Sequence, residues 1–226
     1  MGYENGVMSQ FWTRGARTAL SPAPSRLAGL TAEATRVGSR AVEIKLKSAV
    51  IRPWSVSDAE AIERYANNRK IWLNLRDIFP HPYTLENAHQ FLEMVTHENP
   101  QTNFAIATDS EAIGSIRLKL NTDVHRKTAE LGYWLAELFW GRGIMSDAVA
   151  EFTRRGFQMF DLERIYAEPL ANNPASARVL EKAGFMREAR LRANVFKDGK
   201  LQDSLLYAKL RTESVETSQS SAGILT

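Results

Sequence analysis

The feature that most constrains this chain is a predicted strand that runs into a glycine turn and then into a helix. The strand covers residues 128–137, Gly141 and Gly143 follow it, and an amphipathic helix begins near Ile144. The first N–H groups of a helix have no partner within the helix, and the helix dipole places partial positive charge there. Glycine lets an anion approach the backbone closely, and Arg142 adds a charge. The junction therefore predicts a site for a phosphate or a pyrophosphate.

A second interpretation of the same residues is that the glycines only turn the chain, which is the commoner meaning of a lone Gly-Arg-Gly. The pattern is not a dinucleotide fingerprint, because no third glycine falls at the required offset. It also lacks the Gly-Lys-Ser/Thr of a nucleoside triphosphate site. The turn alone does not decide between these interpretations.

Composition excludes several classes of site. The chain has 226 residues, no cysteine and four scattered histidines, so we expect one domain with no disulfide, no cysteine nucleophile and no metal. No run of 18 apolar residues occurs, so no membrane partner is expected. Residues 1–40 carry five arginines and two glutamates, so the net charge of +3 resides there and the remainder balances at 24 against 24. A neutral body argues against a nucleic-acid partner.

The order of predicted elements indicates a mixed α/β (α+β) fold. Strands are expected at 48–54, 104–107, 112–120, 128–137, 164–170, 186–196 and 201–210. Helices are expected at about 57–67, 85–97, 144–160 and 174–184, the first opening on a capping box at 57–60. Residues 72–83, which contain two prolines, are expected to form a loop.

The two ends of the chain differ from its middle in composition. We expect a globular domain over 45–211 and a disordered tail over 212–226. Residues 1–44 are expected to be a disordered tail or, because the segment is rich in arginine and serine and poor in acidic residues, an organelle transit peptide. The protein is accordingly expected in the cytoplasm, with the mitochondrion as the alternative.

Two correctly spaced motifs carry a resemblance to a known family. The first is Gly132-Tyr-Trp-Leu-Ala-Glu-Leu-Phe-Trp-Gly-Arg-Gly-Ile-Met145, and the second is Asn173-Pro-Ala-Ser-Ala-Arg-Val-Leu-Glu-Lys-Ala-Gly-Phe185. Together, over residues 47–211, they resemble the GNAT superfamily of acetyl-CoA-dependent N-acetyltransferases, and most of all its ribosomal-protein N-terminal acetyltransferase branch. The resemblance implies a mostly antiparallel central sheet of about seven strands with about four helices on both faces.

The resemblance also implies how acetyl-CoA binds. The turn at 139–144 would take the pyrophosphate, a bulge would separate the preceding strand from the next one, and the pantetheine arm would enter that gap. An N–H near Leu135 or Ala136 would face the thioester oxygen. The implied cofactor-binding residues are Leu135, Ala136, Trp140, Gly141, Arg142, Gly143, Ile144, Met145, Asn173 and Ser176. For Asn173 a plain helix N-cap is an equally good interpretation, and for Ser176 a solvated helix serine.

The catalytic residues implied by the resemblance are Glu137 and Ser176. Glu137 would accept the proton of the amine, with Glu130 as the competing base. If alternation extends from Glu130, Glu137 points to the opposite face of the strand. Many GNAT enzymes protonate the leaving thiolate with a tyrosine where this chain has Leu180, so Ser176, water or no group supplies that proton.

The acceptor pocket is expected between the loop 73–83 and the hairpin 196–201. Asp77 and Tyr83 would bind a cationic amine, although Tyr83 and Phe79 also suit simple packing of the loop. The leading function is acetyl transfer to a primary amine, a small molecule or a protein N-terminus, by direct attack on the thioester. The alternative is a non-catalytic acyl-CoA-binding module of the same fold, and a homodimer stays open.

A protein shortened to begin near Lys45 is expected to keep full stability and activity. The reason is that residues 1–40, rich in alanine, serine, arginine and glycine, offer little apolar surface to bury. Thermal unfolding and turnover of the full and shortened proteins check this, and loss of folding on shortening would show that the segment docks onto the domain.

Overall fold

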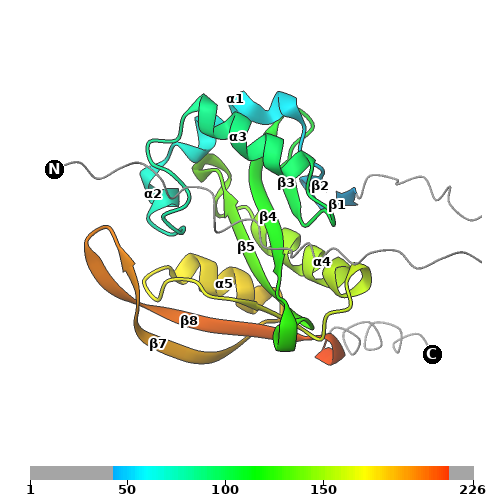
Figure 1. The fold of residues 1–226 in the computed structure, drawn as a ribbon, viewed down its shortest axis with the longest axis vertical. Helices are drawn as coiled ribbons and strands as arrows, with labels where there is room; N and C mark the ends of the chain where they lie inside the picture. The colour runs from blue at the N-terminus through cyan, green and yellow to red at the C-terminus, as the bar shows by residue number, and fades with distance from the viewer. Residues whose placement is uncertain (1–42, 214–226) are drawn as a thin grey trace, which may run out of the picture. The chain divides into compact units, whose positions relative to one another are not determined.

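The computed structural model describes residues 43–213, which form an eight-stranded mixed sheet (Figure 1). The strands follow the order β1-β2-β3-β4-β5-β6-β8-β7, and every neighbouring pair is antiparallel except β5 and β6. The strands are β1 Ile44–Lys45, β2 Val50–Arg52, β3 Asn103–Ala107, β4 Ala112–Leu120, β5 Thr128–Leu135, β6 Arg164–Ala167, β7 Met186–Lys197 and β8 Lys200–Leu210. The predicted fold class is confirmed, and β1 is the addition to the seven expected strands.

The disordered tails and the transit peptide were predicted for the two ends of the chain. Residues 1–42 and 214–226 of these ends lie outside the described residues. At the near boundary Ile44 is only 3% exposed and pairs with Ile51. A shortened protein should therefore begin before Ile44 rather than at Lys45, so that this buried side chain is kept.

The α-helices include the four that were expected and one that was not. They are α1 Ala59–Ala66, α2 Arg69–Trp72, α3 Leu85–Thr96, α4 Ile144–Met159 and α5 Pro174–Lys182. The short α2 was not predicted, because four residues are too few to show a helical periodicity. The side chain of Asn68 caps this helix by accepting a hydrogen bond from the N–H of Lys70. The loop expected from residue 72 thus starts only after α2.

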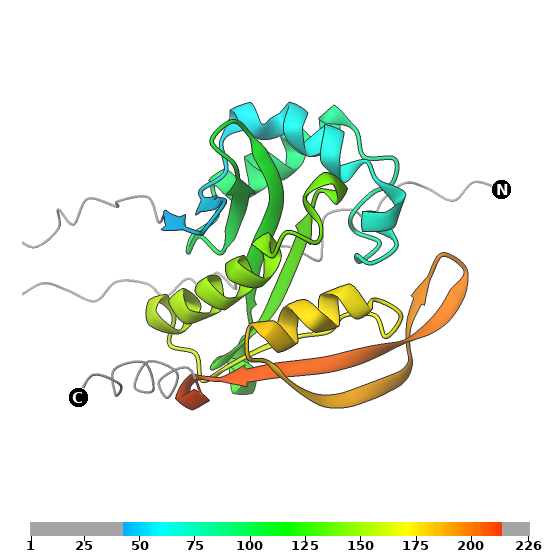
Figure 2. The same ribbon diagram turned by 180° about the vertical axis from the view of Figure 1, so that it is seen from behind.

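The sheet separates two hydrophobic cores, as alternation along β3 shows. Phe104 and Ile106 belong to the core beneath α4 and α5, whereas Ala105 belongs to the core formed with α1 and α3. Figure 2 shows α4 and α5 in front of the sheet, with α1 at its upper end. Because every residue of β3 is buried, the strand is a central element shared by both layers.

The separation of β5 from β6 is the feature of the sheet that positions the site. Their parallel pairing begins at Thr128 and Arg164 and ends at Glu130 and Tyr166. On the other side β5 stays paired with β4 up to Leu135, in an unbroken register. The bulge expected in β5 is therefore wrong, because the gap opens by the divergence of β6 while the β4–β5 ladder remains regular.

The start of α1 corrects a second expectation. The capping box is formed by Ser55 and Asp58, one turn of 3₁₀ helix ahead of α1, and not by residues 57–60. Asp58 is 4% exposed and accepts hydrogen bonds from both Nη atoms of Arg52, each at 2.8 Å, and from the N–H of Ser55. The hydrogen bond to Asp58 raises the pKa of the Arg52 guanidinium above its ordinary value. This pair anchors α1 to the end of β2.

Replacing Asp58 by alanine should lower the free energy of unfolding by about 3 kcal/mol, because Arg52 and a helix start both lose their partner. The value is at the low end for a buried pair, since the Arg52 side chain is still 28% exposed. Urea denaturation measures it. Glu60→Ala, an exposed change in the first turn of α1, is the control and should stay within about 0.5 kcal/mol. Equal effects of the two changes would contradict the anchoring role.

Candidate active site

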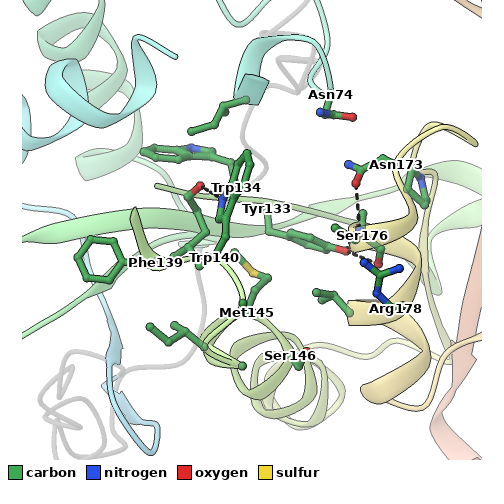
Figure 3. Close-up of a pocket in the computed structure, with 18 of the residues that line it drawn as sticks. Asn74, Tyr133, Trp134, Phe139, Trp140, Met145, Ser146, Asn173, Ser176 and Arg178 are labelled. Atoms are coloured by element: carbon green, nitrogen blue, oxygen red, sulfur yellow. Dashed lines mark hydrogen bonds between the residues drawn. The ribbon is translucent and has the colours of Figure 1, made fainter. Parts of the chain in front are cut away.

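A pocket of about 460 Å³ lies where the end of β5, the following turn and α5 meet α2 (Figure 3). Its size is typical of a site for a small organic ligand. Of the ten residues predicted to bind the cofactor, eight line the pocket and two, Ala136 and Arg142, do not. The eight are Leu135, Trp140, Gly141, Gly143, Ile144, Met145, Asn173 and Ser176. Residues that the sequence did not single out also line it, among them Lys70, Ile71, Asn74, Leu75, Tyr133, Trp134, Phe139, Ser146 and Lys182.

The glycine turn has the open geometry that an anion site needs. Gly141 and Gly143 adopt φ values of 77° and 81°, a left-handed conformation that favours glycine. No atom lies within 4 Å of the position that a Cβ would take at either residue. Gly143 is the N-cap of α4 and no side chain caps this helix, whose first residues, Ile144 to Ser146, line the pocket. Arg142 lies outside the pocket lining, with its guanidinium 5.3 Å from the Phe139 ring.

The end of β5 presents backbone groups to the gap beside it. The N–H of Ala136 donates to the carbonyl of Ile113 on the β4 side at 2.8 Å. Because backbone polar groups alternate in direction along an antiparallel strand, those of Leu135 point the opposite way, toward the gap left by β6. The carbonyl of Leu135 accepts a hydrogen bond from Trp140 Nε1 at 2.7 Å. Of the two predicted donors to a thioester oxygen, Leu135 thus faces the gap and Ala136 does not.

The N-terminus of α5 forms the opposite wall of the pocket. Asn173 caps the helix, its Oδ1 accepting from the N–H of Ser176 at 3.1 Å. The Oγ of Ser176 lies 2.8 Å from the hydroxyl of Tyr133 on β5. Leu180, which occupies the place of the usual tyrosine, is fully buried in the core. Tyr133 was not among the residues predicted for the site, although it lies within the first motif.

Glu137 lies in the turn after β5, where it contacts two residues that the sequence analysis did not connect with it. Since β5 ends at Leu135, strand alternation does not orient Glu137, which sits in the 3₁₀ turn Glu137–Phe139. Its carboxylate accepts hydrogen bonds from Lys70 Nζ and, at 2.8 Å, from Asn68 Nδ2. The hydrogen bond from Lys70, followed by that from Asn68, holds the pKa of Glu137 below its ordinary value. Glu137 therefore joins the turn to α2.

The competing carboxylate, Glu130, belongs to a different environment. It lies on the face of β5 opposite Tyr133 and pairs with Arg76, and its side chain is 13% exposed. It is not part of the pocket lining. The two candidate bases thus lie in different elements, Glu130 on β5 and Glu137 in the turn that follows it.

The loop and the hairpin expected to form the acceptor pocket do meet. Asp77 accepts a hydrogen bond from Lys197 Nζ at 2.7 Å, and the same atom lies 3.7 Å from the centre of the Trp72 ring. Arg69 and Asp198 form a second ion pair between the same segments at 2.7 Å. These contacts hold the hairpin tip against α2 and the loop that follows it.

Tyr83 is placed as a packing residue of that loop. It is 4% exposed, its ring centre lies 4.9 Å from that of Phe79, and it is outside the pocket lining. Burial raises its pKa to about 12. Within residues 43–213, no group of three or more His, Asp or Glu side chains is arranged to hold a metal ion. Nor is any helix of this region long and apolar enough to cross a membrane.

Comparison with known proteins identifies the family. The acetyltransferase (GNAT) domain family matches residues 49–186. The probable N-acetyltransferase YjcK of Bacillus subtilis is 31% identical over 177 residues, which cover 75% of this chain and 98% of that protein. The chain belongs to the GNAT acetyltransferase family. It is therefore an N-acetyltransferase, as the two sequence motifs indicated.

Two further proteins that are similar to this chain are ribosomal-protein acetyltransferases. The ribosomal-protein-serine acetyltransferase of Escherichia coli is 34% identical over 107 residues, 47% of this chain and 59% of that enzyme. The solved structure of RimL, a ribosomal L7/L12 α-N-protein acetyltransferase in complex with coenzyme A, has 21% sequence identity and a TM-score of 0.66, with 75% and 98% of the two chains covered. At that identity the structural likeness shows the shared fold.

The pocket of this GNAT protein fits the family's donor, acetyl-CoA. The uncapped start of α4 offers backbone N–H groups to a pyrophosphate, and Arg178 and Lys182 add positive charge to the lining. The polar edge of β5 beyond Glu130 suits the amides of a pantetheine arm. Acetyl-CoA would supply an acetyl group activated as a thioester, and the residues described above would hold and orient it.

Gly143→Asp should abolish the rise in melting temperature that coenzyme A gives to the parent protein. Ligand binding to the native state stabilises it, and the change would place a carboxylate in the anion site. The matched control is Gly199→Asp, which has the same charge, a φ of 74° in place of 81° and equally open surroundings, but lies in the β7–β8 turn. Thermal unfolding with and without coenzyme A measures the shift. A full shift in the Gly143 variant would place the phosphate site elsewhere.

Proposed function

We propose that this protein transfers the acetyl group of acetyl-CoA to the α-amino group of a protein or to another primary amine, by direct attack on the thioester. The observation that carries the proposal is the gap between β5 and β6, which has the glycine turn at one end and Ser176 at its wall. A gap bordered by unpaired strand backbone suits an extended amide-containing arm, and the turn suits its phosphates.

The choice of a protein N-terminus within the amine class rests on the relatives. The E. coli enzyme is a ribosomal-protein-serine acetyltransferase, and RimL is a ribosomal L7/L12 α-N-protein acetyltransferase. We propose that the acceptor enters where the hairpin tip meets α2, beside Asp77, whose carboxylate pairs with Lys197. An incoming ammonium would compete with Lys197 for Asp77. Tyr83 would support the loop by packing on Phe79.

We assign the stabilisation of the leaving thiolate to Ser176. Its hydroxyl lines the pocket at the first turn of α5, and Leu180 offers no proton donor on that helix. A hydroxyl that donates a hydrogen bond to a developing thiolate stabilises charge as it forms. The backbone N–H of Leu135 is assigned to the thioester oxygen for the same reason.

The amine proton is assigned to Glu137, acting through water. Its lowered pKa keeps it ionised throughout the neutral range, so it also attracts the ammonium form of the acceptor. The carboxylate becomes a better proton acceptor when the contact with Lys70 is exchanged for the substrate amine. Glu130 would keep a structural role through Arg76.

The function is tested by thiol release from acetyl-CoA in the presence of N-terminal peptides, polyamines and amino acids. Peptides with a free α-amino group should release thiol, and the same peptides with a blocked N-terminus should not. If the protein binds acetyl-CoA but releases no thiol with any amine, a non-catalytic acyl-CoA-binding module becomes the better interpretation.

Glu137→Gln should lower turnover by roughly 10²–10⁴ while leaving the affinity for coenzyme A unchanged, because it removes the proton acceptor and keeps the size. The loss should shrink at high pH, where more of the amine is already neutral. The matched variant is Lys70→Met. Without Lys70 the pKa of Glu137 rises toward its ordinary value, so this variant should keep its turnover, and its activity should fall off at a higher pH on the acidic side.

Steady-state rates across pH and coenzyme A titrations measure both variants. Equal losses in Glu137→Gln and Lys70→Met would mean that the pair only joins the turn to α2. Parental turnover in Glu137→Gln would end the assignment of the base, and Glu130 would be tested next.

A further inference from the structure

The hydroxyls of Tyr133 and Ser176 form a contact that the proposed chemistry has not used. The two residues come from different elements, β5 and α5, and face each other across the pocket with their oxygens 2.8 Å apart (Figure 3). Both line the pocket. Tyr133 belongs to the motif that begins at Gly132, and its phenol reaches the serine assigned to the leaving group.

The direction of the hydrogen bond follows from the surroundings of the two groups. Burial raises the pKa of Tyr133 well above that of a free phenol, so Tyr133 carries its proton throughout the working range. The acceptors within reach of that proton are Ser176 Oγ at 2.8 Å and the Ser176 carbonyl at a longer 3.4 Å. The nearer acceptor is favoured. When Tyr133 donates a hydrogen bond to Oγ, the hydroxyl hydrogen of Ser176 is free to form a hydrogen bond with another acceptor.

We propose that Tyr133 is a positioning residue that fixes the Ser176 hydroxyl so that its proton points into the pocket, toward the sulfur of bound coenzyme A. The inference rests on the proposed role of Ser176 at the leaving group. It adds a phenol from β5 to a site whose α5 carries Leu180, buried and apolar, in place of a tyrosine.

The arrangement strengthens the serine as a donor. A hydroxyl that accepts a hydrogen bond becomes a better donor of its own proton, because successive bonds polarise one another. When the amine nitrogen bonds to the acetyl carbon, the carbon–sulfur bond breaks and its electron pair stays on sulfur. Ser176 donates a hydrogen bond to this thiolate and keeps its proton. The thiolate takes a proton from water, and the amine gives one up to Glu137 through water, so neither hydroxyl ionises.

The first test measures the pKa of the coenzyme A thiol in its complex with the protein, and it needs no acceptor. Coenzyme A carrying a carbon-13 label beside the sulfur reports thiol ionisation by its chemical shift. In the parent complex the thiol pKa should lie about one unit below that of free coenzyme A, equal to a tenfold change in the ionisation constant. Tyr133→Phe should remove most of this shift, Ser176→Ala should remove it, and the double variant should remove no more than Ser176→Ala.

Tyr166→Phe is the matched control. Tyr166 lies on the neighbouring strand β6 and its hydroxyl accepts from Asn121 Nδ2 at 3.4 Å, outside the pocket lining. The thiol of coenzyme A bound to the Tyr166→Phe variant should have the same pKa as in the parent complex. Ser176→Thr, which keeps the hydroxyl, should retain part of the shift and lose it when combined with Tyr133→Phe. These variants report on the contact even if one of them alters folding, which thermal unfolding reveals.

The second test is turnover. Tyr133→Phe should lower kcat about tenfold with the dissociation constant of coenzyme A changed less than twofold, and the loss should not multiply with that of Ser176→Ala. The proposal would be overturned if the thiol pKa of coenzyme A were the same in the Tyr133→Phe and parent complexes, or if the losses of kcat in Tyr133→Phe and Ser176→Ala multiplied in the double variant. Neither result would contradict acetyl transfer itself. A parent that shifts the thiol pKa but transfers to no amine would instead contradict the proposed function and leave the tyrosine–serine contact supported.

Discussion

The short parallel pairing between β5 and β6 is the constraint on which the rest of the site depends. The pairing ends at Glu130 and Tyr166, whereas β5 continues in register with β4 as far as Leu135. Beyond Glu130 the backbone of β5 forms hydrogen bonds with β4 on one edge and, within the described residues, has no neighbouring strand on the other. A buried strand edge of this kind is costly unless a ligand or solvent supplies the missing partners. The gap is thus suited to a ligand because the sheet is incomplete there.

The gap is closed at its rim by contacts that come from the short helix α2. Lys70 and Asn68 hold Glu137 in the turn after β5, and Arg69 holds Asp198 at the hairpin tip. Three consecutive residues therefore connect three segments that are far apart in sequence. The ion pairs of Lys70 with Glu137 and of Arg69 with Asp198 are exposed, so water weakens them. The stability of the region comes instead from the two cores beneath it.

Inside the gap, the chemistry is divided between a rigid strand and a helix start. Asn173 fixes the first turn of α5, and this in turn fixes where Ser176 points. Tyr133 reaches the same hydroxyl from β5. Leu180 is buried in the core, so in the proposed mechanism the role of a helix tyrosine would be shared between Ser176 of α5 and Tyr133 of β5. Such a pair is sensitive to the spacing of β5 and α5, which the hydrophobic core maintains.

The sequence by itself determined the fold class, the order of the main elements and most of the pocket lining near the turn. These are local properties: periodicity defines strands and helices, and the glycines at 141 and 143 define the turn. It also determined the cap at Asn173, since a cap is read within one turn of helix. Where it erred locally, as with the capping box at Ser55, two competing serines stood within two residues of each other.

Only the tertiary structure decided which groups meet. Alternation along β5 predicted a direction for Glu137, but the strand ends first and the side chain turns to Lys70 instead. Tyr133, which was not among the predicted site residues, meets Ser176 of α5, and Asp77 pairs with Lys197, 120 positions away in the sequence. These contacts join segments distant in the chain, and no local propensity encodes them. They arise because two cores fix the distances between elements, and that is decided only when the whole sheet is assembled.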